Sequence, residues 1–318
     1  AVGEEAFIPA TDISSLALFT VQSLDRDAMT YEAGLRIERL AMDQSAGCDS
    51  DDTNVSGSLA AIWRYRDDTN LLLSLNHSQR AATVEERYSN IDAACNEVDQ
   101  ADLIAHAATQ RLEIGNPDAD TEKSTNIEFG WRKHAGTVTA EFNLFYNSIS
   151  DYLYLFDTGE FADDVQVSHY LQDDAVFRGF EAEVSFPLYD TGSHLSELNL
   201  FSDYVDARFE NSGNVPRIPP LRYGFELTHS HIDWLVRLRW TKVAAQSDHA
   251  WNESRSGGFY ELSLYADYHM NLGERTSLLL FARGNNLLDE RIRYHSSLLK
   301  DVAPAPGRGV ELGLRIEF

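Results

Sequence analysis

Histidine and carboxylate side chains gather in two polar stretches of the chain. In each stretch a histidine follows two or three acidic residues. The candidate metal ligands are His106, His169, Glu97, Asp99, Asp102, Asp163 and Asp164. Imidazole and carboxylate together suit zinc in sites of three or four ligands. Because neither stretch contains an HxxxH or HxH pair, the alternative is a hydrated acidic surface that holds no ion.

Other polar motifs in the sequence offer less specific chemistry. Asp49, Asp51 and Asp52 supply the oxygen ligands that calcium takes on loops, although their spacing does not match an EF-hand. His229 and His231 form an HxH pair in a segment that we interpret as an ordinary short turn. The sequence contains no GxSxG elbow, HExxH motif or glycine-rich phosphate loop, so no enzyme activity is expected.

These residues belong to a chain with the period-two alternation of β-strands. The clearest apolar face consists of Val310, Leu312, Leu314, Ile316 and Phe318. About thirteen segments alternate in this way, and most are about ten residues long. Ten tilted residues cross a membrane, whereas the strands of ordinary domains average about five or six. The pattern predicts an all-β fold, a transmembrane antiparallel β-barrel, with a large soluble β-sandwich as the alternative.

The composition is strongly acidic and yet rich in apolar residues. Lys and Arg number 26 against 51 Asp and Glu, which gives a net charge of −25. This charge excludes nucleic acid as a partner bound through its phosphates. Apolar residues make up 43% of the chain, too many for a disordered acidic tail. We expect the charge on loops and inward strand faces, and the apolar residues against outer-membrane lipid.

Short turns and long loops alternate along the chain. The long loops are predicted at about 41–53, 79–123, 150–175, 206–220, 242–257 and 286–306. Outer-membrane barrels of Gram-negative bacteria have this layout, with short periplasmic turns and long extracellular loops. If Phe318 ends at the periplasm, a count of thirteen strands starts the chain outside the cell. Since bacterial single-chain barrels have an even strand number, residues 1–318 are expected to form the C-terminal portion of a larger barrel.

The two cysteines fall in adjacent predicted loops on the extracellular side. Cys48 and Cys95 are 47 positions apart, and neither stands in a metal-binding spacing. Disulfides persist in oxidising compartments such as the periplasm and the cell surface. We therefore interpret the pair as a disulfide that ties the two loops together, with free thiols as the alternative.

Four motifs, in order along the chain, resemble those of TonB-dependent outer-membrane receptors. Residues 81–88 (AATVEERY) and 112–124, with GNPD and EKS, are similar to two elements of one loop in that family. Residues 281–289 contain the NLLD exit of a penultimate strand, and 304–318 looks like the final strand. The resemblance implies a 22-strand barrel whose plug domain is not in this chain. It also implies that the terminal Phe318 is the signal read by the barrel-assembly machinery.

Within that family the chain is most similar to zinc- and haem-type receptors, through segments such as 105–109 (AHAAT). The resemblance implies uptake of a scarce metal ion or metal complex, with zinc favoured as the transported ligand. The energy would come from the TonB complex through the missing N-terminal part, and no cofactor would be required. Haem or siderophore-iron uptake is one alternative. A plug-free porin-like channel, or a surface adhesion or phage-binding barrel, is another.

Overall fold

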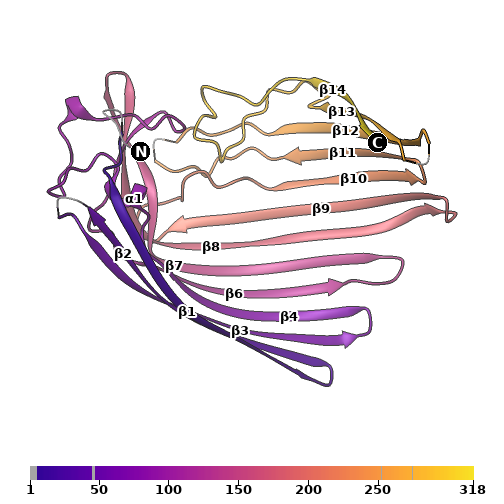
Figure 1. Cartoon of the computed structure of the whole chain (residues 1–318), viewed down its shortest axis with the longest axis horizontal. Coiled ribbons are helices and arrows are strands. Elements are labelled where there is room, and N and C mark those ends of the chain that lie inside the picture. The colour runs from indigo at the N-terminus through magenta and orange to yellow at the C-terminus, as the bar shows by residue number, and fades with distance from the viewer. Residues whose placement is uncertain (1–5, 45–46, 252, 274) are drawn as a thin grey trace.

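A computed structural model describes residues 6–44, 47–251, 253–273 and 275–318, which form one large β-sheet (Figure 1). The first strands are β1 (Thr11–Arg26), β2 (Met29–Gln44), β3 (Ser50–Arg66), β4 (Thr69–Arg80), β5 (Arg111–Ile114), β6 (Glu122–Lys133) and β7 (Thr139–Ala162). The others are β8 (Val165–Asp190), β9 (His194–Phe209), β10 (Arg222–His231), β11 (Trp234–Val243), β12 (Phe259–Asn271), β13 (Ser277–Asn285) and β14 (Gly309–Glu317). The helices are α1 (Val84–Tyr88) and a 3₁₀ turn, η1 (Gln100–Asp102).

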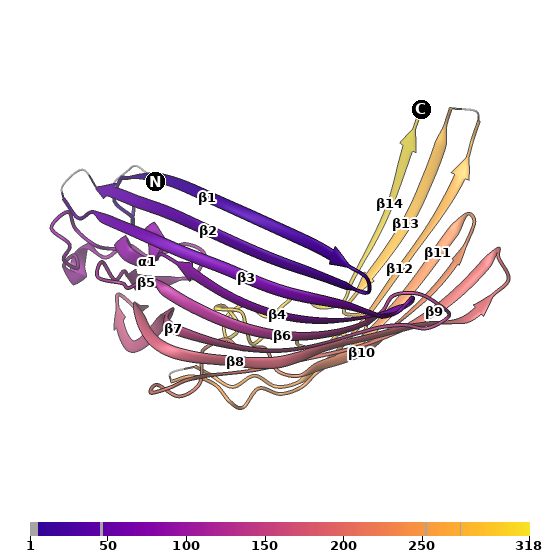
Figure 2. The same cartoon turned by 90° about the horizontal axis from the view of Figure 1, so that it is seen from below.

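Each strand pairs antiparallel with the next along the chain, except that β5 leaves this path and pairs in parallel with β8. The all-β class and an antiparallel sheet of about thirteen strands are therefore confirmed. Figure 2 shows the sheet bending into a trough, with β1 and β14 at its two open edges. The long connections and α1 lie at one end of the sheet and the short turns at the other (Figure 1). In the described part, no helix is both long and apolar enough to span a membrane.

The two faces of the sheet differ in chemistry because residues directly opposite in antiparallel strands share a face. Leu227 of β10 lies opposite Leu238 of β11, while Glu226 lies opposite Arg239 and pairs with it at 3.2 Å. The apolar face stays exposed, and Leu312 is 77% accessible. An exposed apolar face and a charged opposite face are what a membrane barrel wall requires.

The buried core lies at the loop end of the sheet. Its main cluster comprises Met42, Cys48, Tyr88, Ile91, Leu112, Ile114 and Val167. A second cluster, around Tyr154 and Phe209, joins the extended ends of β7 and β9. The long connections are therefore packed structures that can hold side chains in fixed positions.

Two predicted loops are largely strand. Segment 150–175 is the outer part of the β7–β8 hairpin, because its aromatic residues Tyr152, Tyr154 and Phe156 pack against the second cluster. Most of 41–53 continues β2 and β3, which pair as far as Met42 and Ser50. Residues 45–46 of that prediction and residue 252 of the predicted loop 242–257 lie outside the described residues.

Candidate functional site

The short helix α1 is fixed at both of its ends. Thr83 and Glu86 form a capping box, in which each side chain accepts a hydrogen bond from the other residue's backbone N–H. This arrangement satisfies two of the free donors at a helix N-terminus. At the other end, the buried guanidinium of Arg87 pairs with Asp52 at 3.0 Å. Glu85, in the first turn, therefore projects from a well-anchored helix.

The strand β5 passes directly against α1 at Gly115. A Cβ atom on Gly115 would lie 2.4 Å from the carbonyl oxygen of Arg87, so only glycine permits this approach. The Gly115 N–H donates to the carbonyl oxygen of Ser89 at 2.8 Å. Parallel pairing with β8 places Glu113 opposite Ser168 and buries both residues. The glutamates of α1 and β5 thus come together from 28 positions apart in sequence.

His106 lies between these two glutamates. Its Nδ1 is 3.3 Å from Oε1 of Glu113, and its Nε2 is 3.8 Å from Oε1 of Glu85. One ligand atom from each residue fits within 4.8 Å of the others. Glu113 is fully buried, whereas the Glu85 side chain is 41% exposed, so the cluster opens toward solvent on the Glu85 side. We call Glu85, His106 and Glu113 the outer-loop cluster.

Hydroxyl groups hold the buried carboxylate of Glu113 in place. Tyr170 donates to Oε2 at 2.9 Å, and Thr109 donates to Oε1. Burial, together with the negative charge of Glu113, raises the pKa of Tyr170, so its phenol stays protonated and keeps donating. The carboxylate is therefore oriented before any ligand arrives.

One imidazole and two carboxylates form a mixed N/O donor set. Such a set suits zinc and other divalent first-row metals, and excludes soft ions that need sulfur ligands. Three protein ligands also leave positions open for water or for a ligand handed over from another part of a protein. The outer-loop cluster can therefore hold a transition-metal ion in an accessible, exchangeable site.

The structure separates His106 from the other predicted ligands. His169 pairs instead with Glu97, its Nδ1 lying 3.6 Å from Oε1. Asp99 and Asp102, which flank and end η1, are exposed. Glu85 and Glu113 were missed by the sequence reasoning, because the pairing of β5 with β8 that buries Glu113 has no local signal in the sequence.

Asp163 and Asp164 have a conformational role at the tip of the β7–β8 hairpin. Both have positive φ, at 49° and 64°. A two-residue turn with positive φ at both positions matches the twist of its strands, and aspartate tolerates that conformation. Both side chains are exposed, and neither belongs to the outer-loop cluster.

The aspartates considered for calcium are engaged in other contacts. Arg39 pairs with Asp51, and Arg87 pairs with Asp52. Asp49 accepts a hydrogen bond from the backbone N–H of Gln44 at 2.9 Å. Each of the three carboxylates therefore has at least one oxygen engaged by another group of the protein.

Cys48 and Cys95 form the expected disulfide, with their Cα atoms 5.3 Å apart. Cys48 is buried in the main core cluster beside Tyr88, the last residue of α1. The bond therefore ties the β2–β3 connection to the segment that carries His106.

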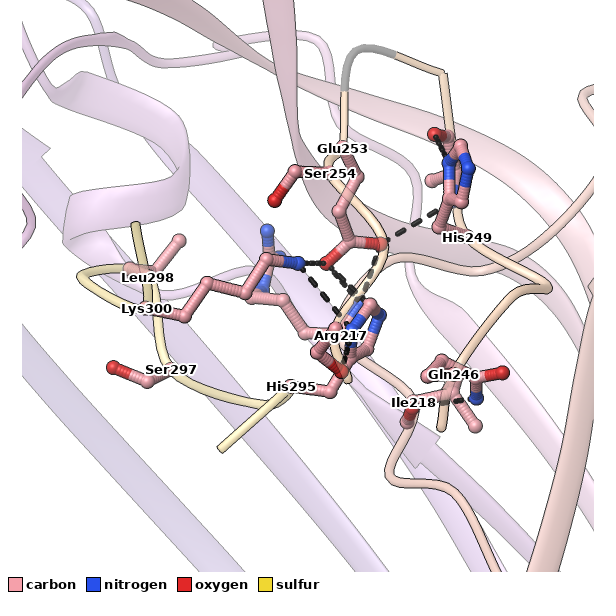
Figure 3. Close-up of polar contacts among 12 residues, drawn as sticks. Arg217, Ile218, Gln246, His249, Glu253, Ser254, His295, Ser297, Leu298 and Lys300 are labelled. Atoms are coloured by element: carbon pink, nitrogen blue, oxygen red, sulfur yellow. Dashed lines mark hydrogen bonds and ion pairs between the residues drawn. The ribbon is translucent and has the colours of Figure 1, made fainter. Parts of the chain in front are cut away.

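A second polar cluster joins three other loops (Figure 3). Lys300 and His295 converge on the carboxylate of Glu253, at 2.9 and 3.4 Å. The backbone N–H of Arg217 donates to the same carboxylate at 3.1 Å. Burial would raise the pKa of Glu253, but His295 and Lys300 outweigh it and lower that pKa to about 2. We call Glu253, His295 and Lys300 the loop clasp.

Ser256 lies next to the loop clasp and, with His295 and Glu253, supplies the residue types of a hydrolase triad. Ser256 Oγ lies 3.0 Å from Nδ1 of His295, and Glu253 lies on the other side of the ring. Ser256 is only 7% exposed and lies within the packed loops. The cleft beside the clasp has room for about 60 Å³, which accommodates a few water molecules. The clasp therefore fastens loops together.

Comparison with known proteins identifies the family to which this chain belongs. A family model described as TonB dependent receptor-like, beta-barrel, matches residues 2–287. The chain belongs to this family. Its members are transport receptors, which agrees with the absence of enzyme motifs from the sequence.

Solved transport receptors share this fold. The copper transporter OprC is 20% identical with a TM-score of 0.76, over 97% of this chain and 48% of OprC. The FrpB iron transporter from Neisseria meningitidis (F3-3 variant) is 18% identical with a TM-score of 0.69, over 96% and 45%. The ferric yersiniabactin uptake receptor FyuA from Yersinia pestis is 20% identical with a TM-score of 0.66, over 97% and 46%. The chain spans about half the length of these receptors.

Proposed function

We propose that this chain is the C-terminal barrel portion of an outer-membrane TonB-dependent receptor that takes up a scarce metal ion, with zinc as the favoured cargo. The loops would face the exterior of a Gram-negative cell and the short turns the periplasm. Energy would come from the TonB complex, acting through a plug domain and further strands that belong to the same receptor. No catalytic step is proposed.

The outer-loop cluster carries this proposal. It lies at the loop end of the barrel wall, it opens to solvent through Glu85, and its donor set suits zinc. An ion captured there would be bound before it reached the barrel lumen. The three protein ligands would contact a bare ion directly, which favours an ion over haem or a siderophore complex.

The alternative functions, an adhesion or phage-binding barrel and a plug-free channel, require different residues in the loops and on the inward face of the sheet. An adhesion or phage-binding barrel needs no cation site in its loops. A plug-free channel is consistent with a polar wall, but does not require paired charges of both signs. Here Glu226 pairs with Arg237 at 3.1 Å, and Asp203 pairs with Arg222 at 2.8 Å. An inward face with paired charges of both signs suits contact with a folded plug domain.

Zinc titration of the full-length purified receptor by isothermal calorimetry tests the proposal. We expect His106→Ala to weaken zinc binding at least about 10-fold, because it removes one of three ligands. His249→Ala, an exposed loop histidine outside the outer-loop cluster, is the matched control and should change nothing. His169→Ala tests the separate pair with Glu97. Unchanged zinc affinity in His106→Ala would rule out capture by the outer-loop cluster.

A further inference from the structure

Three histidines meet at the opposite end of the barrel wall from the outer-loop cluster. His194 begins β9, and His229 and His231 end β10, its neighbour in the sheet. His231 lies directly opposite His194, and His229 lies opposite Ser196. Figure 1 shows β9 and β10 running side by side to the turn end of the sheet. Antiparallel pairing thus brings together imidazoles that are 35 positions apart in sequence.

These histidines are on the apolar face of the wall. His229 lies opposite Val236 of β11, in the same alternating set as Leu227 and Leu238. The intervening Glu226 belongs to the opposite, charged face, where it pairs with Arg239. The cluster therefore borders the lipid-facing band at its turn end, outside the lumen through which cargo would pass.

The spacing of the ring nitrogens matches that of metal ligands. Nδ1 of His194 lies 3.4 Å from Nε2 of His229. Two nitrogens bound to one tetrahedral ion at about 2.05 Å are separated by about 3.3 Å. Because His229 Nδ1 lies 2.6 Å from Ser196 Oγ, that hydroxyl can accept a hydrogen bond from Nδ1–H, which leaves the Nε2 lone pair free. Metal-binding histidines are commonly oriented in this way.

The environment of His231 is not explained by a hydrogen bond between the other two histidines. An N–H···N bond between His194 and His229 would account for their own contact. The Nδ1 of His231 is buried and has no hydrogen-bond partner among the residues that the structure describes. The ring centroids of His231 and His194 are 4.5 Å apart, and a different His231 rotamer is required before one of its nitrogens can join the other two. Trp234 stacks on His229 at 5.0 Å and shields that side of the cluster.

We propose that His194, His229 and His231 form a second metal site, which binds a divalent transition-metal ion at the turn end of the lipid-facing wall. An all-imidazole set favours borderline ions, with copper(II) bound most tightly in the usual order of affinities. The bound ion would link the ends of β9 and β10. This second site differs from the outer-loop cluster in its location and in its ligands.

Electron paramagnetic resonance of copper(II) added to the metal-stripped, full-length receptor tests the site. The experiment uses the His106→Gln background, which removes the imidazole of the outer-loop cluster. We expect one bound copper whose spectrum shows coupling to more than one imidazole nitrogen. His229→Gln should remove part of that coupling and weaken binding at least about 10-fold, and Ser196→Ala should weaken it by about 10-fold through loss of ring orientation.

The matched control is His269→Gln, a histidine at the same end of the wall but on its charged face, next to Asp267. It should leave the copper spectrum unchanged. Heat-dependent mobility on a gel checks that each variant is a folded barrel. The proposal is overturned if folded His229→Gln and Ser196→Ala bind copper like their parent. It is equally overturned if the parent binds no copper, since the histidines then form only a hydrogen-bonded cluster.

Discussion

The loop clasp gives a stability prediction that can be worked out from its contacts. Glu253→Gln keeps the size of the side chain but removes its charge. Lys300, whose side chain is 6% exposed, would then lose the carboxylate that lies 2.9 Å away. An unpaired buried charge is costly because it loses hydration without gaining a partner. The three loops joined by the clasp should therefore open more readily.

The pKa of Glu253 sets the size of the effect. It falls from an ordinary value of 4.5 to about 2. A difference of this size corresponds to about 3 kcal/mol at neutral pH, and solvent screening reduces it to about 2–3 kcal/mol. Because the folded-state pKa is the lower one, this stabilisation is fully present above about pH 4.5 and is lost as the pH falls toward 2. At neutral pH the loss multiplies the local opening constant by about 30 to 150.

Hydrogen exchange of the full-length receptor, followed by mass spectrometry, measures this opening. Peptides from segments 210–221, 244–258 and 286–308 of Glu253→Gln should exchange faster by that factor at pH 7. In the unaltered protein, protection corrected for intrinsic exchange should decline between pH 5 and pH 2. Glu210→Gln, an exposed glutamate in the first of these segments, is the control. The role given to this carboxylate would be refuted if Glu253→Gln were as well protected as the unaltered protein and if the protection of the unaltered protein did not change with pH.

Three further predictions concern the scaffold of the outer-loop cluster. Reducing the disulfide should destabilise the loop end by about 4 kcal/mol in the chain-entropy model for a 47-residue separation, seen as a lower thermal midpoint. Gly115→Ala should disrupt the contact of β5 with α1 and weaken zinc binding. Gly257→Ala, which has open space around it, should leave zinc binding unchanged. Equal zinc affinity in the two variants would contradict this packing. Asp163→Asn combined with Asp164→Gly should retain zinc binding and thermal stability, because both residues suit the same turn; weaker zinc binding would show that these aspartates are ligands.

The strand pattern could be predicted from sequence because it depends on local alternation. Segment 310–318 shows this, since its apolar set is the exposed face of β14. Segment 150–175 was misjudged because its strands continue beyond the membrane, where aromatic residues face a loop core rather than lipid. The sequence shows an acidic pair at Asp163 and Asp164, but it does not show the positive φ angles that these residues adopt in the turn.

The outer-loop cluster was only partly predictable. The structure places His106 beside acidic residues, but these come from α1 and from β5 and not from the predicted stretch 97–102. Sequence proximity pointed to Glu97, which instead faces His169. The parallel pairing of β5 with β8 buries Glu113, and no local pattern specifies that pairing. The HxH pair at 229–231 was interpreted as an ordinary turn, and its nearness to His194 was not foreseen because that residue comes from another strand.

Zinc uptake by cells that carry the full-length receptor tests the central claim most directly. The comparison is between the unaltered receptor, its Glu113→Gln variant and the unaltered receptor in cells without TonB. Glu113→Gln removes the charge offered to the ion and keeps one of the two oxygens that accept from Tyr170 and Thr109. We predict saturable uptake that falls several-fold in the variant and is abolished without TonB. Zinc uptake that persists without TonB and is equal in the variant would contradict the account.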